Sequence, residues 1–232
     1  MVDTSFDFRT DSYGRDPDSA SATLKQFHIE LWSKPLPGGM SLRLEDAGPE
    51  YLRAKHDGRL LRVTSDTISN SLAGHKRIAS LMPRISKNLV QEVKDLGSTV
   101  GSRVVFPGDK VKNKPSINVS RGFHPRIKDR FDLTLECIRR HYQSEASPLE
   151  NVLSRHHAFF SLFENFEGYV GFFLLDDLLA KGGVKFFVDA ENCFAVSPYP
   201  ASVFEYETYL NRTLDFLAAR NERIDRVFSS DS

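Results

Sequence analysis

The chain of 232 residues has few cysteines, no long apolar run and no pattern of a signal peptide. Its only two cysteines, Cys137 and Cys193, sit inside apolar runs, which speaks against a disulfide framework and favours buried free thiols in a reducing compartment. The longest apolar-rich run, 169–180, is too short to span a bilayer and contains two aspartates. The N-terminus has no basic stretch followed by an apolar one, so no signal peptide is predicted. These absences predict a cytoplasmic protein that does not enter a membrane.

Sequence patterns of several reaction classes are also missing. There is no Gly-x-Ser-x-Gly elbow, which excludes a standard hydrolase triad, and no Gly-x-Gly-x-x-Gly, which excludes a dinucleotide-binding fold. His156 and His157 are adjacent, and no partner stands at metal-ligand spacing from them. We therefore predict no metal site, and the sequence leaves any cofactor unknown.

The chain has no net charge, because 31 basic residues balance 31 acidic ones, but the charges are unevenly spread. Residues 1–74 carry a net charge of −2, residues 75–130 of +9 and residues 131–232 of −7. A basic middle segment suits a phosphate, a nucleotide or a nucleic-acid backbone. The alternative is that the acidic C-terminal half packs against this segment and neutralises it.

The first half of the chain reads as strands and two amphipathic helices. Apolar spacing predicts the helices at about 20–33 and 86–96. Strands are predicted at 40–44, 59–63, 103–106 and 116–119. The last two are expected to form a hairpin with a long, basic tip that carries Lys110, Lys112 and Lys114.

From Pro125 onward the pattern is mostly helical. Two Ser-x-x-Glu capping boxes, at 147–150 and 202–205, predict helices that extend to about 163 and 228, and a third helix is expected at 166–180. A strand is predicted at 184–189. This segregation of strands and helices predicts an α+β fold with a small antiparallel sheet. We expect one domain over 1–232, with a mixed lobe (1–124) and a mainly helical lobe (125–232) as an alternative description.

The stretch 116–142 is the most informative, and it reads as a strand, a glycine turn and a helix. Counted from Ile127 at helical spacing, one face of the helix is apolar, while Leu133 and Cys137 fall on the opposite side. A helix that is apolar on two sides is packed on both, so its charged residues lie between layers. Such charges must be paired with one another or must meet a ligand.

Two interpretations of these charges stay open. In the first, the arginines form an anion site, and the carboxylates orient them or act as acid or base. The ligand-binding candidates are then Asn118, Arg121, Arg126, Arg130, Arg139 and Arg140, and the catalytic candidates are Asp129, Asp132 and Glu136. In the second, the same residues form an ion-pair network that fixes the position of the helix.

The whole chain resembles an uncharacterised bacterial family, a domain of unknown function. The matching runs are Phe6–Asp11, Leu31–Pro37, Ile117–Asn118, Arg121–Phe123, Asp129–Tyr142 and Arg220–Asn221. The resemblance covers nearly the full length, and it implies that the chain is a complete unit. It implies no activity.

The first functional hypothesis is therefore a protein that binds a nucleotide or phosphorylated small molecule, and acts on it if the protein is an enzyme. The second is a non-catalytic interaction module of bacterial conflict or regulation, whose basic segment 75–130 meets an acidic protein surface. The third is a nucleic-acid binder that uses the lysines of the hairpin tip.

Overall fold

The computed structural model describes residues 2–56, 58–108, 111–181, 183–188 and 193–229, apart from the side chains of Asp18, Pro49 and Lys112. Its strands are β1 (Glu45–Asp46), β2 (Leu52–His56), β3 (Arg59–Thr67), β4 (Arg103–Pro107), β5 (Leu179–Ala180) and β6 (Gly183–Val184). Its helices are α1 (Pro17–Ala20), α2 (Ala22–Ser33), α3 (Lys76–Leu81), α4 (Lys87–Leu96), α5 (Ile117–Phe123), α6 (Phe131–Tyr142), α7 (Glu150–Arg155), α8 (His157–Phe160), α9 (Phe166–Phe172) and α10 (Val203–Ser229). The predicted α+β class is confirmed.

Strands β1 to β4 form an antiparallel sheet in sequence order. Buried and exposed residues alternate along β2, so Leu52 and Ala54 face the core while Arg53 faces solvent. A tight turn joins β2 to β3, with His56 opposite Arg59. Gly58 in this turn has φ +72°, a left-handed conformation that glycine adopts without strain.

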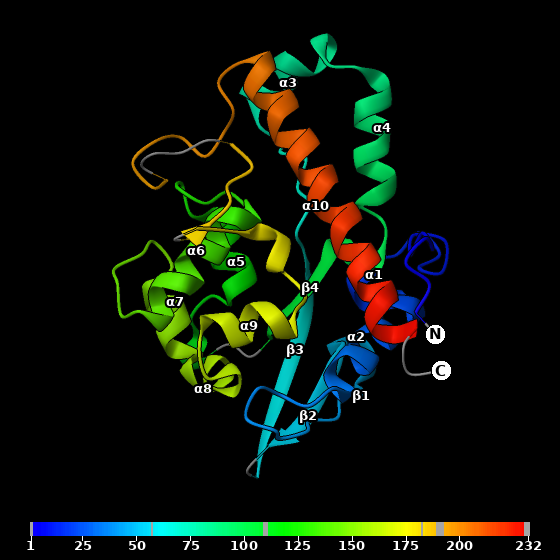
Figure 1. Cartoon of the computed structure of the whole chain (residues 1–232), viewed down its shortest axis with the longest axis vertical. Coiled ribbons are helices and arrows are strands. Elements are labelled where there is room, and N and C mark those ends of the chain that lie inside the picture. Colours follow the sequence, from blue (N-terminus) through cyan, green and yellow to red (C-terminus); the bar gives the residue numbers. More distant parts are fainter. Residues whose placement is uncertain (1, 57, 109–110, 182, 189–192, 230–232) are drawn as a thin grey trace.

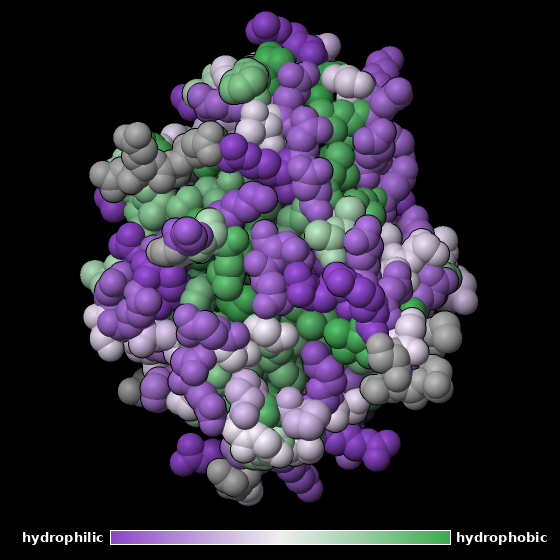
Figure 2. Space-filling view, viewed as in Figure 1, coloured by the Kyte–Doolittle hydropathy of each residue, from purple (hydrophilic) through white to green (hydrophobic). Residues whose placement is uncertain are grey.

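The helices stand on two sides of the sheet (Figure 1). The long helix α10 runs beside α4 on one side, and α5 to α9 gather on the other (Figure 1). On the face drawn in Figure 2, hydrophilic side chains cover the outer sides of α10 and α4, and apolar ones show in the seam between them. The two chain ends lie close together, where the Thr4 hydroxyl donates to Asp225 Oδ2 at 2.8 Å.

Aromatic side chains fill the core between the two halves of the chain. Trp32 of α2 is fully buried, and its ring lies 5.2 Å from that of Phe172 and 6.0 Å from that of Phe163. Edge-to-face contacts of this kind add to the free energy gained by burying the rings. The buried apolar residues form a single cluster that extends from Phe8 to Ile224.

The predicted basic hairpin is wrong. Strand β4 pairs with β3, and residues 117–123 form helix α5 in place of a strand. The cause is local, because the Ser116 hydroxyl accepts a hydrogen bond from Val119 N at 3.4 Å and caps the helix. Lys114 therefore lies in the connection from β4 to α5, and Lys110 lies outside the described residues.

Several predicted boundaries are also wrong. Strand β2 has no predicted counterpart, whereas the residues expected as a strand at 40–44 lie outside any strand and insert Leu42 and Leu44 into the core. The helix expected at 166–180 ends at Phe172, and Leu174 has φ +57°, which an α-helix does not allow. The helix expected to reach 163 is broken into α7, α8 and a short 3₁₀ turn. Of the strand expected at 184–189, only Val184 lies in a described strand, and Asp189 lies outside the described residues.

Candidate functional site

Helix α6 is buried on both sides, as the sequence predicts. Every residue from Phe131 to Ile138 is buried, including Asp132 and Glu136. The helix begins later than expected, however, with Arg130 as its N-cap, because Lys128 and Asp129 have φ +48° and +60°. The candidate site is thus carried by two helices and the turn between them, and the charged residues separate into three groups.

The first group surrounds Arg121, which is fully buried. Its guanidinium donates to Asp66 Oδ2 at 2.6 Å, to the carbonyl of Asp129 at 3.0 Å and to Thr134 Oγ1 at 3.2 Å. The rings of Phe106 and Phe131 each lie 5.8 Å from it. Together with a fourth hydrogen bond, from Nη1 to the carbonyl of Thr67 at 3.2 Å, these contacts engage all three nitrogens of the buried guanidinium, so Arg121 anchors α5 to β3 and α6.

Asp129 stands apart in this group. Its Oδ1 lies 3.9 Å from Arg121 Nη1, too far for a hydrogen bond, and its carboxylate is one-third exposed. Partial burial raises the pKa of the Asp129 carboxyl, Arg121 lowers it in part, and the charge of Asp66 raises it further. Of the three predicted catalytic residues, Asp129 is the one with a shift in the direction that suits proton transfer near neutral pH.

The second group is the buried pair of Arg130 and Asp132. Arg130 binds both carboxylate oxygens of Asp132, and its Nη1 donates to the carbonyl of Pro198 at 3.1 Å. Asp132 Oδ2 also accepts from Phe187 N at 2.9 Å. Each charge therefore has a close partner of opposite sign, as a buried ion pair requires.

The third group is centred on Glu136. Arg139 Nε donates to its Oε2 at 2.8 Å and Arg140 Nε to its Oε1 at 2.7 Å. Burial raises the pKa of Glu136, but the hydrogen bonds from the two arginines outweigh it and the net pKa is lowered. Glu136 is therefore ionised at neutral pH, and its carboxylate orients the two arginines.

The remaining predicted residues lie at different places. The Asn118 amide donates to Thr64 Oγ1 at 3.3 Å and to the carbonyl of Ser65 at 3.2 Å, so it ties α5 to β3. Arg126, in contrast, is exposed, and its guanidinium has no ion pair within the described residues. The predicted residues are thus distributed over several places, and two of them, Arg126 and Arg140, line a common cleft.

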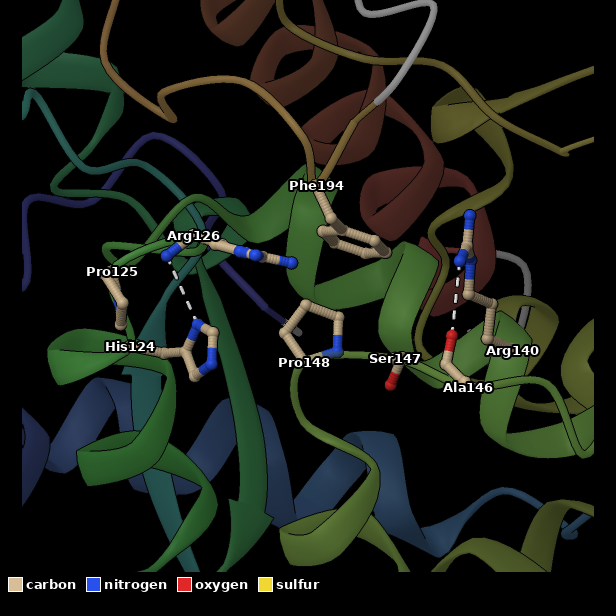
Figure 3. Close-up of a pocket in the computed structure, with 8 residues that line it drawn as sticks. All are labelled: His124, Pro125, Arg126, Arg140, Ala146, Ser147, Pro148 and Phe194. Atoms are coloured by element: carbon tan, nitrogen blue, oxygen red, sulfur yellow. Dashed lines mark hydrogen bonds between the residues drawn. The ribbon is translucent and has the colours of Figure 1, made fainter.

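These two arginines line a cleft of 510 Å³ between the α5–α6 turn, the start of α7 and Phe194 (Figure 3). The Arg126 side chain extends toward the Phe194 ring, which lies between it and Arg140 in this view (Figure 3). Arg140 stacks over that ring at 4.9 Å, and its Nη1 donates to the carbonyl of Ala146 at 3.2 Å. Pro148 adds apolar surface between the arginines (Figure 3).

His124 also lines this cleft, and its state is set by its neighbours. Its Nδ1 accepts from the backbone N–H of Arg126 at 3.2 Å, so the neutral ring carries its proton on Nε2. Burial lowers the pKa of His124, and the charges of Arg126 and Lys128 lower it further. Burial and the two neighbouring cations therefore favour the neutral form of the imidazole. The sequence carries no signal that would single out Phe194, since the approach of Phe194 to α6 depends on the tertiary fold.

The structure also shows the state of the two cysteines and the placement of the possible metal ligands. Cys137 and Cys193 are buried free thiols, as predicted, and burial raises the pKa of Cys137 to about 12. Among the residues that the structure describes, no group of three or more His, Cys, Asp or Glu side chains is placed to hold a metal ion. No helix within the described ranges has the length and apolar character needed to cross a bilayer.

Comparison with known proteins gives one match. The model described as "Family of unknown function (DUF6994)" matches residues 2–224, nearly the whole chain, which confirms the full-length resemblance. No curated protein and no solved structure matches the chain. The match includes the α5–α6 region and the Arg220–Asn221 pair, and it brings no activity with it.

Proposed function

We propose that this chain, which belongs to the family of unknown function DUF6994, binds a small phosphorylated molecule in the cleft of Figure 3. The observation that carries the proposal is the exposed guanidinium of Arg126, which extends into a cleft already lined by Arg140 and His124. A guanidinium presents paired donors that match the oxygens of a phosphate.

Three polar side chains, those of Arg126, Arg140 and His124, contribute to binding in different ways. Arg126 supplies the charge that no carboxylate of the described chain offsets, whereas Arg140 shares its charge with Glu136 and offers its outer donors. The Nε2–H of His124 adds a neutral donor, which becomes a charged one if the bound phosphate raises the pKa of the ring. The dianionic phosphate group thus accepts hydrogen bonds from both sides of the cleft.

The apolar wall of the cleft favours a ligand with a flat organic part. The ring of Phe194 and the side chain of Pro148 stand between the arginines (Figure 3). A nucleobase packs well on such a surface, and it reaches it while its phosphate is held by Arg126. We therefore infer that a nucleoside monophosphate is a better ligand than inorganic phosphate.

The test is calorimetric titration of the full chain with AMP, adenosine and inorganic phosphate. AMP should bind most tightly, and Arg126→Gln should weaken its binding about tenfold, the usual effect of losing a charged hydrogen bond. The matched control is Arg84→Gln, which removes the same charge from an exposed arginine at the end of a 3₁₀ turn. Its affinity should equal that of the unchanged protein.

Other outcomes separate the alternatives. Equal affinities in Arg126→Gln and the unchanged protein, or no binding of any phosphate compound, would contradict the proposal. An interaction module would then be the better hypothesis, with an acidic protein surface as the partner of segment 75–130. The nucleic-acid hypothesis has lost its specific support, because the basic hairpin on which it was placed does not form.

A further inference from the structure

A second cleft of 280 Å³ opens on the other side of the α5–α6 turn, and none of the proposed phosphate contacts lies in it. Its walls are the C-terminal end of α5, the turn residues Lys128 and Asp129, the start of α3 at His75, and Tyr199. The Asp129 carboxylate, which accepts no hydrogen bond from the described residues, lines this cleft. The carboxylate oxygens can therefore accept hydrogen bonds from a ligand.

The Asp129 carboxylate lies near Arg121, which also pairs with Asp66. Arg121 Nη1 lies 2.6 Å from Asp66 Oδ2 and 3.9 Å from Asp129 Oδ1, so these two oxygens are no farther apart than the sum of these distances, 6.5 Å. Gly122 allows this approach, because a Cβ on it would lie 3.1 Å from Asp129 Oδ1. Lys128 and Asp129 both have positive φ, which is unfavourable for residues with a side chain. The backbone conformation that places Asp129 here is therefore strained.

Aromatic rings flank the carboxylate. His75 and Tyr199 stack with their ring centroids 3.5 Å apart and their planes 12° from parallel. His75 Nδ1 accepts from Arg77 N at 3.3 Å, which fixes the ring and leaves the proton on Nε2. Phe123 also lines the cleft, and 79% of its surface is exposed, so burial in the protein core does not stabilise its side chain.

The charges around the cleft cancel. Asp66 and Asp129 are balanced by Arg121 and Lys128, whose Nζ donates to the carbonyl of Phe123 at 3.2 Å. An anion would meet the free carboxylate, and a cation would meet Lys128, so neither gains a net attraction. A neutral ligand that donates hydroxyl hydrogens to a carboxylate and packs apolar C–H surface on aromatic rings fits both features.

We propose that this cleft binds a neutral saccharide, with Asp129 accepting hydrogen bonds from its hydroxyls and Phe123 packing on its ring. The stacked Tyr199–His75 pair lines the same cleft, and the Tyr199 hydroxyl and the His75 Nε2–H supply further polar contacts. The site is independent of the phosphate cleft, since the two share no lining residue.

The test is a ¹H–¹⁵N correlation titration of the full chain with a panel of neutral monosaccharides and disaccharides. Sodium phosphate and tetramethylammonium chloride represent the anionic and cationic alternatives. At least one saccharide should shift the amides of Gly122 and Phe123. Its Kd should rise about tenfold in Asp129→Asn, which keeps the side-chain shape and removes the charge.

The matched pair of variants is Phe123→Ala and Phe204→Ala. Both residues are equally exposed, at 79% and 78%, but Phe204 belongs to α10 and does not line this cleft. Neither change disturbs buried packing, so both variants should fold, and the dispersion of the same spectra checks this. Phe123→Ala should weaken saccharide binding severalfold, and Phe204→Ala should leave it unchanged.

Three results would overturn the inference. The first is the absence of amide shifts with every saccharide of the panel. The second is a shift of the Gly122 and Phe123 amides with phosphate or with the ammonium salt but with no saccharide, which would assign this cleft to an ion. The third is an unchanged Kd in both Asp129→Asn and Phe123→Ala, which would place any observed saccharide elsewhere on the protein.

Discussion

Two arginines of the chain, Arg121 and Arg220, are fully buried, and they are satisfied in different ways. Arg121 meets the carboxylate of Asp66, whereas Arg220 donates to the carbonyls of Gly101, Arg103 and Phe173 at 2.6 to 3.2 Å. Burial lowers the pKa of Arg220 to about 9, which still leaves it charged at neutral pH. Buried charges that carry their own partners are fixed within the fold and are poor candidates for ligand binding.

His28 lies close to this buried positive charge. It is fully buried, and burial, followed by the charges of Arg220 and Arg103, lowers its pKa to about 3. The unfolded chain protonates a histidine below pH 6.5, while the folded chain keeps His28 neutral down to about pH 3. The stability that depends on neutral His28 is therefore complete above pH 6.5 and falls as the pH drops from there toward 3.

We expect His28→Leu to remove this part of the pH dependence. Below the pKa of an unfolded histidine, the unchanged protein should lose about 1.4 kcal/mol of unfolding free energy per pH unit relative to the variant. Between pH 7 and pH 5 the difference between the two proteins should therefore shift in favour of the variant by about 2 kcal/mol. Urea denaturation at the two pH values measures it. A difference that is the same at both values would refute the assigned pKa.

At the scale of elements, the same sequence pattern has two outcomes. Both 147–150 and 202–205 read Ser-x-x-Glu. At α10 the Ser202 hydroxyl accepts from Glu205 N at 3.1 Å, and Glu205 Oε2 accepts from Ala201 N at 2.7 Å. Helix α7 begins at Glu150, and its N-cap residue is Leu149, whose side chain makes no cap hydrogen bond.

Alanine at the two serines should therefore have different effects. Ser202→Ala should lower the unfolding free energy by about 1 kcal/mol, the usual loss for an N-cap. Ser147→Ala should cost less than half of that, since its hydroxyl caps no helix amide. Chemical denaturation of the two variants side by side gives the comparison, and equal losses would mean that the shared pattern, and not the observed hydrogen bond, decides the effect.

At the scale of the whole molecule, contacts across the middle of the chain join its two halves. Trp32, the single tryptophan, packs against rings contributed by α8, α9 and the turns that follow them. Arg220 and Asn221 of α10 bind the segment before β4, where Asn221 Oδ1 accepts from Gly101 N at 3.0 Å. A Cβ on Gly101 would lie 2.1 Å from Asn221 Oδ1, so glycine is required for this approach.

These contacts predict unfolding in one step. Trp32 fluorescence reports on the junction between residues 1–124 and 125–232, and far-ultraviolet circular dichroism reports on all helices. The two signals should give the same midpoint and slope in urea, as one cooperative unit requires. Separate midpoints would instead establish the two-lobe alternative, with the fluorescence change marking the parting of the lobes.

The sequence by itself determined the α+β class, the helices α2, α4 and α10, and the burial of α6 on both sides. Each depends on a periodic pattern or a cap within a few residues, which is how local physics acts. It also singled out the charged residues of 116–142. Periodicity could not identify the charged partner of Arg121, because Asp66 lies 55 residues earlier in the sequence.

Tertiary structure decided the rest. Strand β4 pairs with the distant β3 and not with the neighbouring residues 116–119, and this choice of partner excludes the predicted hairpin. The two clefts exist because the turn after α5 meets Phe194 on one side and Tyr199 on the other, side chains about 70 residues farther along the chain. Pairing consumes the buried charges and leaves Arg126 and Asp129 accessible, so what a site can bind depends on which groups the fold leaves without partners.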